Sequence, residues 1–510
     1  MPFLLLLALS LVCMPVRWPE SPLGLSVLDS ALLTGLSLFA VVLATLARVK
    51  RECQRLATEP AQRDVILHRY GGRRFLHLSL LLAVYGTALL VFGWGRAVQD
   101  LCTVDDVLYP GAELLILAPF LIAQLACWAV FWDLEHALHR ATLSPWDEGK
   151  PFWGRWAYVG FHVRQNLSLV LVPLGLFIAQ EGTARLFPTL EGTWWFAGLR
   201  LSTVFGLLLV MPGLLRHLLG WQPLPAGMVR DRLEALARRL RFRCRDILVW
   251  PTRGGIANAL LVGLLPRFRY VVLTDRLLRD LEPTELEAVL GHEIGHVKHH
   301  HMLYYLGFML LSILVIATGW SLLYAEMVGP ELAGAIQGGD VPTAETGVRT
   351  ASRLQDDWRL TFPLVPVLGA YVFVVFGFLS RRCERQADIW GCRAVSCAAS
   401  RCQGHTDDDL ERCDGRSLCP TGIRTFTRAL DKVAALNGMS RHRPGWLQSW
   451  LHSTIARRIE FLEELMEDPG LERRFQRRVT LVKWGLLIGL TGVLVLLVGA
   501  ADQDNVLRLL

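Results

Sequence analysis

Long apolar segments separated by polar ones run through most of the chain. Nine of them are candidate membrane spans, because a helix needs roughly 20 apolar residues to cross a bilayer. They lie at about residues 1–16, 25–46, 75–97, 112–132, 167–180, 195–215, 302–325, 361–380 and 481–500. The first also fits a poor signal peptide, and 167–180 is short for a span. The pattern predicts a mainly α-helical, multi-pass membrane protein.

The polar segments alternate in charge, which predicts how the chain crosses the membrane. Basic residues crowd into residues 48–63, 133–164 and 216–245, whereas residues 98–111 contain three aspartates and no lysine or arginine. Because basic loops face the cytoplasm, we place residues 216–300 and 381–478 on the cytoplasmic side. The protein is expected in the cell (inner) membrane.

Shorter patterns appear within the first of these cytoplasmic segments. Residues 228–240 have the spacing of an amphipathic helix, and residues 246–250 and 269–274 have the β-branched enrichment of strands. A small mixed α/β region is therefore expected before residue 283. Its strand order does not follow from the pattern.

Composition agrees with a membrane protein and argues against one class of partner. Of the 510 residues, 52% are hydrophobic and only 19% are charged, against about 25% charged in soluble domains. The net charge is +7, but the basic residues lie beside apolar segments and no nucleic-acid motif is present. We therefore expect the lipid bilayer, and no nucleic acid, as a partner.

One short pattern carries chemistry: His292, Glu293 and His296 form the sequence His-Glu-x-x-His. On a helix this spacing puts both imidazoles on one face, with a carboxylate beside them. A catalytic zinc ion needs such nitrogen ligands, an open position for water and an acid/base within reach. The pattern also arises by chance in long chains, so a further ligand is needed to distinguish a metal site.

A second acidic pattern offers that ligand. Glu384 and Asp388 follow the apolar segment that ends near residue 380 and lie one helical turn apart. One of them can bind a metal while the other orients a ligand histidine. Two predicted crossings separate His296 from Glu384, so both lie on the same side of the membrane. Their distances from the neighbouring spans put a zinc ion within roughly 10–15 Å of the inner membrane boundary.

These motifs resemble the integral-membrane zinc metallopeptidases of the HtpX and type I CAAX prenyl endopeptidase kind. The resemblance covers about residues 225–465 and rests on residues 291–298, residues 380–388 and the pair Asn258–Ala259. It implies a gluzincin-type domain in which one Zn²⁺ is bound by His292, His296 and Glu384. Glu293 is then the catalytic acid/base and Asp388 orients a ligand.

Further site residues follow from the same resemblance and from the predicted strand. Residues 452–459 are similar to the family's His-Pro-x-x-x-x-Arg-Ile stretch, with Ser453 where proline is usual, so His452 and Arg458 are expected to support the substrate or the oxyanion. The strand near Tyr270 and Val272 is expected to offer an edge that binds an extended peptide. Asn258, ahead of the family's edge strand, joins this substrate-binding set.

Three other clusters have weaker signals. His299, His300 and His301 are interpreted as a solvated or interfacial polar cluster. The run Asp133, Glu135, His136 and His139 lacks a matching metal ligand elsewhere. Cys392, Cys397, Cys402, Cys413 and Cys419 crowd into one polar segment, where Cys402, His405, Cys413 and Cys419 are candidate ligands of a structural zinc. A surface insertion is the default interpretation of that segment.

The sequence thus predicts three regions: an N-terminal membrane region (1–219), a metallopeptidase domain interrupted by two spans (220–465), and a C-terminal segment with a last span (466–510). The predicted function is hydrolysis of peptide bonds in membrane-associated or misfolded proteins near the cytoplasmic face. A non-catalytic scaffold or receptor with a structural metal is the alternative, although such a site has no need of Glu293. A transporter is a third possibility, which the scarcity of charged residues inside the N-terminal spans weakens.

Overall fold

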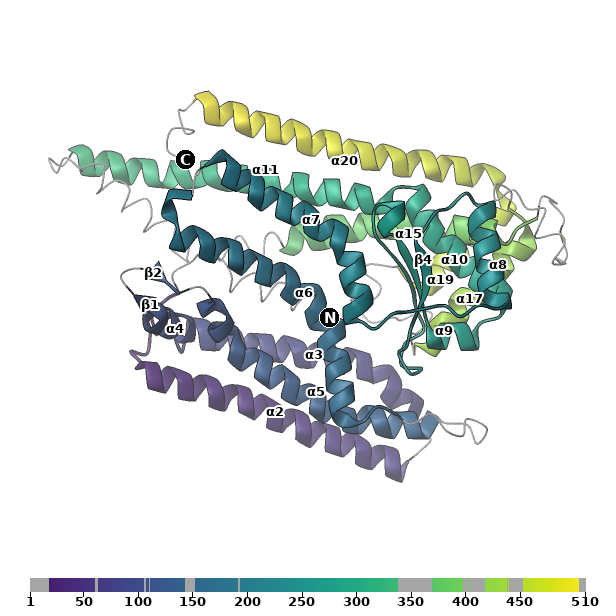
Figure 1. Ribbon diagram of the computed structural model, residues 1–510, viewed down its shortest axis with the longest axis horizontal. Coiled ribbons are helices and arrows are strands. Elements are labelled where there is room, and N and C mark those ends of the chain that lie inside the picture. The colour runs from purple at the N-terminus through teal and green to yellow at the C-terminus, as the bar shows by residue number, and fades with distance from the viewer. Residues whose placement is uncertain are drawn as a thin grey trace.

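The structure is a computed structural model that describes residues 18–59, 63–104, 107–109, 111–142, 152–190, 193–337, 369–397, 402, 418–437, 439 and 453–503. Most described residues are helical, as predicted. A group of long helices occupies one end of the molecule, and a small sheet with shorter helices occupies the other (Figure 1).

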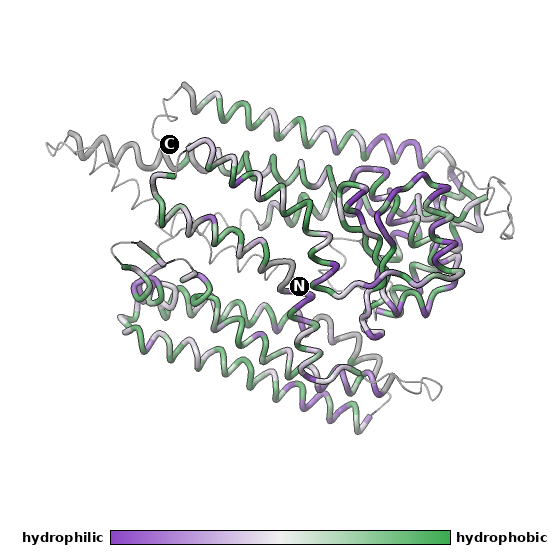
Figure 2. Tube along the Cα trace, in the orientation of Figure 1, coloured by the Kyte–Doolittle hydropathy of each residue, from purple (hydrophilic) through white to green (hydrophobic). Residues whose placement is uncertain are grey.

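Five described helices are long and apolar enough to cross a membrane. They are α2 (Val27–Thr58), α5 (Ala112–Thr142), α7 (Trp194–Leu218), α11 (His301–Gln337) and α20 (Pro469–Gln503). Each contains one of the predicted spans. Large apolar side chains on these helices are exposed, for example Leu36 and Ile488 at 62% and 66%. Such faces fit contact with lipid, and Figure 2 shows apolar residues along these helices and polar residues gathered around the sheet.

The other predicted spans have different outcomes. Residues 75–97 fall on two helices, α3 (Arg63–Leu90) and α4 (Trp94–Cys102), which meet at an angle of 54°. If these two helices together form one span, the described residues contain six candidate spans. Residues 167–180 lie within α6 (Arg155–Leu186), which is not among the described helices apolar enough to cross. Residues 1–16 and 361–368 lie outside the described residues.

Gly93 allows the bend between α3 and α4. Its φ of +70° is unfavourable for residues with a side chain. A Cβ atom there would lie 2.8 Å from the Ser21 backbone nitrogen, so the segment before α2 also fits closely over the bend. The helices α2, α3 and α5 pack side by side around a core that includes the fully buried Leu117 and Phe120 (Figure 1).

The sheet at the other end has the strand order β3-β4-β6-β5. Its strands are β3 (Gln222–Pro223), β4 (Asp246–Trp250), β5 (Ala259–Val262) and β6 (Tyr270–Thr274). Strands β4 and β6 are parallel and the other two pairs are antiparallel. The predicted strands at 246–250 and 269–274 are confirmed.

The prediction that Tyr270 and Val272 lie on a free edge is wrong. Both belong to β6, which pairs with β4 on one side and β5 on the other. Their side chains are almost fully buried, at 2% and 0% exposure. The edge on the cavity side is β5 instead.

Helices cover this sheet and complete the domain. They are α8 (Met228–Arg239), as predicted, α9 (Asp275–Asp280), α10 (Pro283–Lys298), α15 (Gly377–Ala394), α17 (Pro420–Leu436) and α19 (Ile455–Glu467). A π-helical turn, η4 (Val372–Phe376), precedes α15. Minor elements are the β1–β2 hairpin (Thr103–Val104, Val107–Leu108), η2 (Pro188–Leu190) and η3 (Pro266–Phe268).

Helix α10 begins at a strong N-terminal signal and packs closely on α15. Pro283 occupies its first turn, and Glu282 and Glu285 form a capping box. Added Cβ atoms at Gly291 and Gly295 would lie 2.2 Å from the Ala394 Cβ and 2.8 Å from the Trp390 Cβ. The two glycines therefore let α10 and α15 approach to near backbone contact.

Candidate metal centre

The contact between α10 and α15 brings His292, His296 and Glu384 together. Their ligand atoms all lie within 4.8 Å of one another. The two Nε2 atoms are 3.3 Å apart, and each lies 3.8 Å from a Glu384 oxygen. Four tetrahedral ligands at zinc–nitrogen distances of 2.0–2.1 Å stand about 3.3 Å apart, so the donor set and its spacing fit a zinc ion.

Asp388 orients the first of these ligands. Its Oδ1 lies 3.0 Å from His292 Nδ1, which keeps the proton on Nδ1 and directs the Nε2 lone pair toward the other ligands. Burial alone would raise the pKa of Asp388, but the Arg458 guanidinium and His292 lower it below its ordinary value. Asp388 therefore stays ionised. Phe426 of α17 stacks on the His292 ring at 5.9 Å and restricts its rotation.

Arg458 lies inside the site and is committed to carboxylates. Its Nε donates to Asp388 Oδ2 at 2.8 Å, its Nη2 donates to Asp388 Oδ1, and its Nη1 lies 3.4 Å from Glu384 Oε2. Its side chain is buried. These contacts favour a role in holding the two acids over direct oxyanion binding. Its predicted companion, His452, lies outside the described residues.

His301 is a site residue that the sequence interpretation missed. It is fully buried, and its Nδ1 lies 3.0 Å from His296 Nδ1, so the solvated-cluster interpretation is wrong for this histidine. Its Nε2 lies 3.1 Å from Gln386 Oε1, which also accepts a hydrogen bond from Lys483 Nζ of α20. Burial and the neighbouring His292 lower the pKa of His296 to about 4, so His296 is neutral at pH 7. With Nε2 facing the metal position, His296 Nδ1–H donates to His301.

We expect His301→Asn to weaken zinc binding by roughly 10–100-fold, because loss of a residue that orients a ligand commonly costs that much. Competition with a zinc-binding dye measures the change. His300→Asn is the matched control, since His300 is exposed and asparagine tolerates its φ of 52°. Equal affinities of the two variants would show that the contact between His301 and His296 does not position the ligand.

The metal centre opens onto a cavity of about 1560 Å³. This volume exceeds the 300–1,000 Å³ of ordinary small-molecule pockets. The cavity is lined by Glu293, by Asn258 and the β5 residues Ala259 to Leu261, and by residues of the N-terminal helices. On that far wall, Glu135 accepts hydrogen bonds from Tyr70 at 2.6 Å and from Arg74 at 2.8 Å. Within the described residues, Glu135 and His139 belong to no metal cluster.

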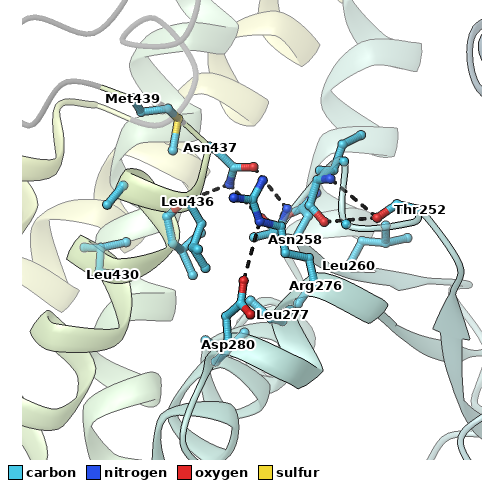
Figure 3. A pocket seen from close by; sticks show the side chains of 18 of the residues that line it. Thr252, Asn258, Leu260, Arg276, Leu277, Asp280, Leu430, Leu436, Asn437 and Met439 are labelled. Atoms are coloured by element: carbon cyan, nitrogen blue, oxygen red, sulfur yellow. Dashed lines mark hydrogen bonds and ion pairs between the residues drawn. The ribbon is translucent and has the colours of Figure 1, made fainter. Parts of the chain in front are cut away.

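One end of the cavity lies between the start of β5 and the end of α17 (Figure 3). Asn437, which no sequence motif indicated, donates from Nδ2 to the Ala257 carbonyl at 2.7 Å and accepts from the Ala257 N–H at 3.1 Å. This pair fixes the approach to β5. The N–H of Thr274 donates a hydrogen bond to the Asn258 carbonyl. In an antiparallel pair, every second residue of a strand bonds to its neighbour, so the N–H and C=O groups of Ala259 and Leu261 point away from β6.

Comparisons with known proteins agree with this geometry. Residues 223–465 match the model of peptidase family M48. The CAAX prenyl protease 1 homolog of Arabidopsis thaliana is 29% identical over 242 residues, covering 45% of this chain and 55% of that protein. A protease HtpX homolog of Archaeoglobus fulgidus is 32% identical over 138 residues, covering 26% of this chain and 41% of that protein.

The chain therefore spans about half the length of the curated relatives it matches, 55% and 45% for two CAAX prenyl protease 1 homologs. A solved structure, S. mikatae Ste24p, has the same fold over a longer range. It aligns with a TM-score of 0.52 and 16% identity, covering 85% of this chain and 99% of that one. The likeness extends beyond the region of the metal centre to the membrane helices.

Proposed function

We propose, from the match of residues 223–465 to the model of peptidase family M48, that this chain is a membrane-embedded zinc metalloendopeptidase. Its substrates are peptide bonds of membrane-associated or misfolded proteins. The observation that carries the proposal is the convergence of His292, His296 and Glu384 from two helices, with Glu293 on the same cavity wall. A structural metal site would have no use for Glu293 or for a cavity of this size.

The chain's own residues account for most of the reaction. A bound zinc ion supplies Lewis-acid polarisation of the peptide carbonyl and of the attacking water. Glu293 takes the proton of that water and passes it to the leaving amine. Asp388 and Arg458 hold the ligands in place, because each is buried and paired with the other. His452 remains a proposed oxyanion donor.

The substrate is proposed to bind in extended form along β5. The peptide groups of Ala259 and Leu261 are turned toward the cavity and can pair with a peptide backbone. Asn258 lines the same wall. Main-chain pairing is tolerant of sequence, which suits an endopeptidase that accepts several proteins.

A cleavage assay with metal removal tests the activity. Purified protein in detergent is expected to cleave a quenched fluorescent peptide library, and 1,10-phenanthroline is expected to reduce the rate to background because the ligand set is then empty. Added Zn²⁺ should restore the rate. Cleavage that persists through chelation would contradict a metal-dependent reaction.

We further propose that the site faces the cytoplasm at the inner membrane. The basic residues of 216–245, which directly follow the α7 span, support this orientation. A topology reporter fused near residue 270 should read as cytoplasmic. An external reading would overturn the orientation and leave the chemistry in place.

A further inference from the structure

A second group of metal-type side chains lies just beyond the C-terminal end of α15. Among the described residues, two groups of three such side chains have ligand atoms within 4.8 Å of one another: His292, His296 and Glu384, and a cluster of Cys397, Cys402 and Cys419. Glu384 and the last residue of α15, Ala394, are ten positions apart, or about 15 Å along the helix. The three sulfurs thus lie well away from the metal centre described above.

The spacing of the sulfurs suits a common ion. Zinc–sulfur bonds of about 2.3 Å put tetrahedral thiolate ligands about 3.8 Å apart, inside the observed limit. Cys402 and Cys419 are buried at 9% and 1% exposure. A disulfide would use only two of the three sulfurs. On the cytoplasmic side proposed above, such bonds are also rare.

The surrounding contacts hold the cysteines in place. Cys419 is the N-cap of α17, and its Sγ accepts a hydrogen bond from the Gly422 N–H at 3.3 Å, which fixes the sulfur at the start of the helix. Its own N–H donates to Ser396 Oγ at 3.2 Å, one residue before Cys397. Thr421 Oγ1 donates to the Cys402 carbonyl at 3.2 Å. Each of the three positions is therefore tied to the same junction.

The junction between α15 and α17 is tight. Ser396 Oγ donates to the Cys392 carbonyl at 2.7 Å and so links the end of α15 to Cys419. A Cβ atom at Gly422 would lie 2.1 Å from Ser396 Oγ and 2.9 Å from the Cys392 carbonyl oxygen. Two helices that meet this closely give a metal ion a preorganised set of ligands.

We propose that Cys397, Cys402 and Cys419 bind a second, structural zinc ion. Thiolate ligands select soft or borderline ions such as Zn²⁺ over Mg²⁺ and Ca²⁺. The ion ties α17 to α15, which carries Glu384, and α17 in turn places Phe426 on His292. His405 and Cys413 of the predicted ligand set lie outside the described residues, and Cys397 was not predicted as a ligand. Zinc binding at this cluster does not require the proposed peptidase activity.

Metal analysis of the full chain tests this site. We expect about two zinc ions per chain in the wild type and about one in each of two variants, Glu384→Gln, which empties the first site, and Cys402→Ser/Cys419→Ser, which empties the second. Cys244→Ser is the matched control, because Cys244 is partly buried and outside the cluster. Loss of the second ion should also lower the midpoint of thermal unfolding. A wild-type zinc count in the double cysteine variant would overturn the proposal.

Spectroscopy keeps the test valid if the cysteine variants fail to fold. Glu384→Gln loaded with Co²⁺ is expected to show a thiolate-to-cobalt charge-transfer band, since its remaining ligands are sulfurs. X-ray absorption of its zinc form should give zinc–sulfur distances of about 2.3 Å. A spectrum without sulfur ligands would overturn the site. An intact mass showing two cysteines joined as a disulfide, with no second zinc, would do the same.

Discussion

Glu293→Gln is expected to leave zinc bound and to lower the rate of peptide hydrolysis by a factor of about 10²–10⁴, the usual contribution of a general acid/base. Glutamine keeps the size of the side chain but cannot accept the proton of the attacking water. Glu293 is not a member of the ligand group, so the zinc content should not change. The measurement is kcat on a quenched peptide together with zinc content by mass spectrometry.

Glu287→Gln is the matched control for this variant. It lies on the same helix, is buried, and pairs with Arg232 at 2.8 Å on a face outside the cavity. Its activity should stay near that of the wild type. If Glu293→Gln hydrolysed peptide at the wild-type rate, the assignment of Glu293 as the acid/base would have to be abandoned.

The second large effect is on stability. Arg458→Ala is expected to destabilise the protein by about 3–5 kcal/mol, because it leaves the ionised and fully buried Asp388 without its guanidinium partner. Thermal or denaturant unfolding in detergent reports the change. Zinc binding should weaken as well, since Asp388 orients His292.

A double variant separates loss of the arginine from loss of the charge pair. Arg458→Ala/Asp388→Asn removes the unpaired charge, so it should be more stable than Arg458→Ala alone. Arg457→Ala is the control, because Arg457 is exposed at the adjacent position of α19. If the double variant were less stable than Arg458→Ala, the buried pair would not be the source of the effect.

The residues whose relative positions could be predicted from sequence are those fixed by local helix geometry. His292, Glu293 and His296 lie within five positions on one helix, and Glu384 and Asp388 lie one turn apart on another. The two predicted crossings between His296 and Glu384 put both helices on the same side of the membrane. The close contact that joins them depends on Gly291 and Gly295, whose role is visible only when the two helices are packed.

The residues that were missed depend on contacts between distant parts of the chain. Strand order put β5, not β6, at the edge, and a β-branched run does not specify which strands are its neighbours. His301 contacts His296, and Gln386, 85 positions away, holds its other ring nitrogen. Asn437 meets Ala257 across 180 positions, without any motif. Cys397 lacks a Cys-x-x-Cys partner, so its spacing did not indicate a ligand.

The near backbone contact at Gly291 and Gly295 has a consequence for how related sequences can be screened. Any larger residue at either position must separate α10 from α15, and the histidines from Glu384 with them. A relative could keep every ligand and still have lost the geometry that binds the ion. These two glycines are therefore diagnostic markers of a working metal centre, alongside the ligands themselves, when active relatives are to be distinguished from degenerate ones.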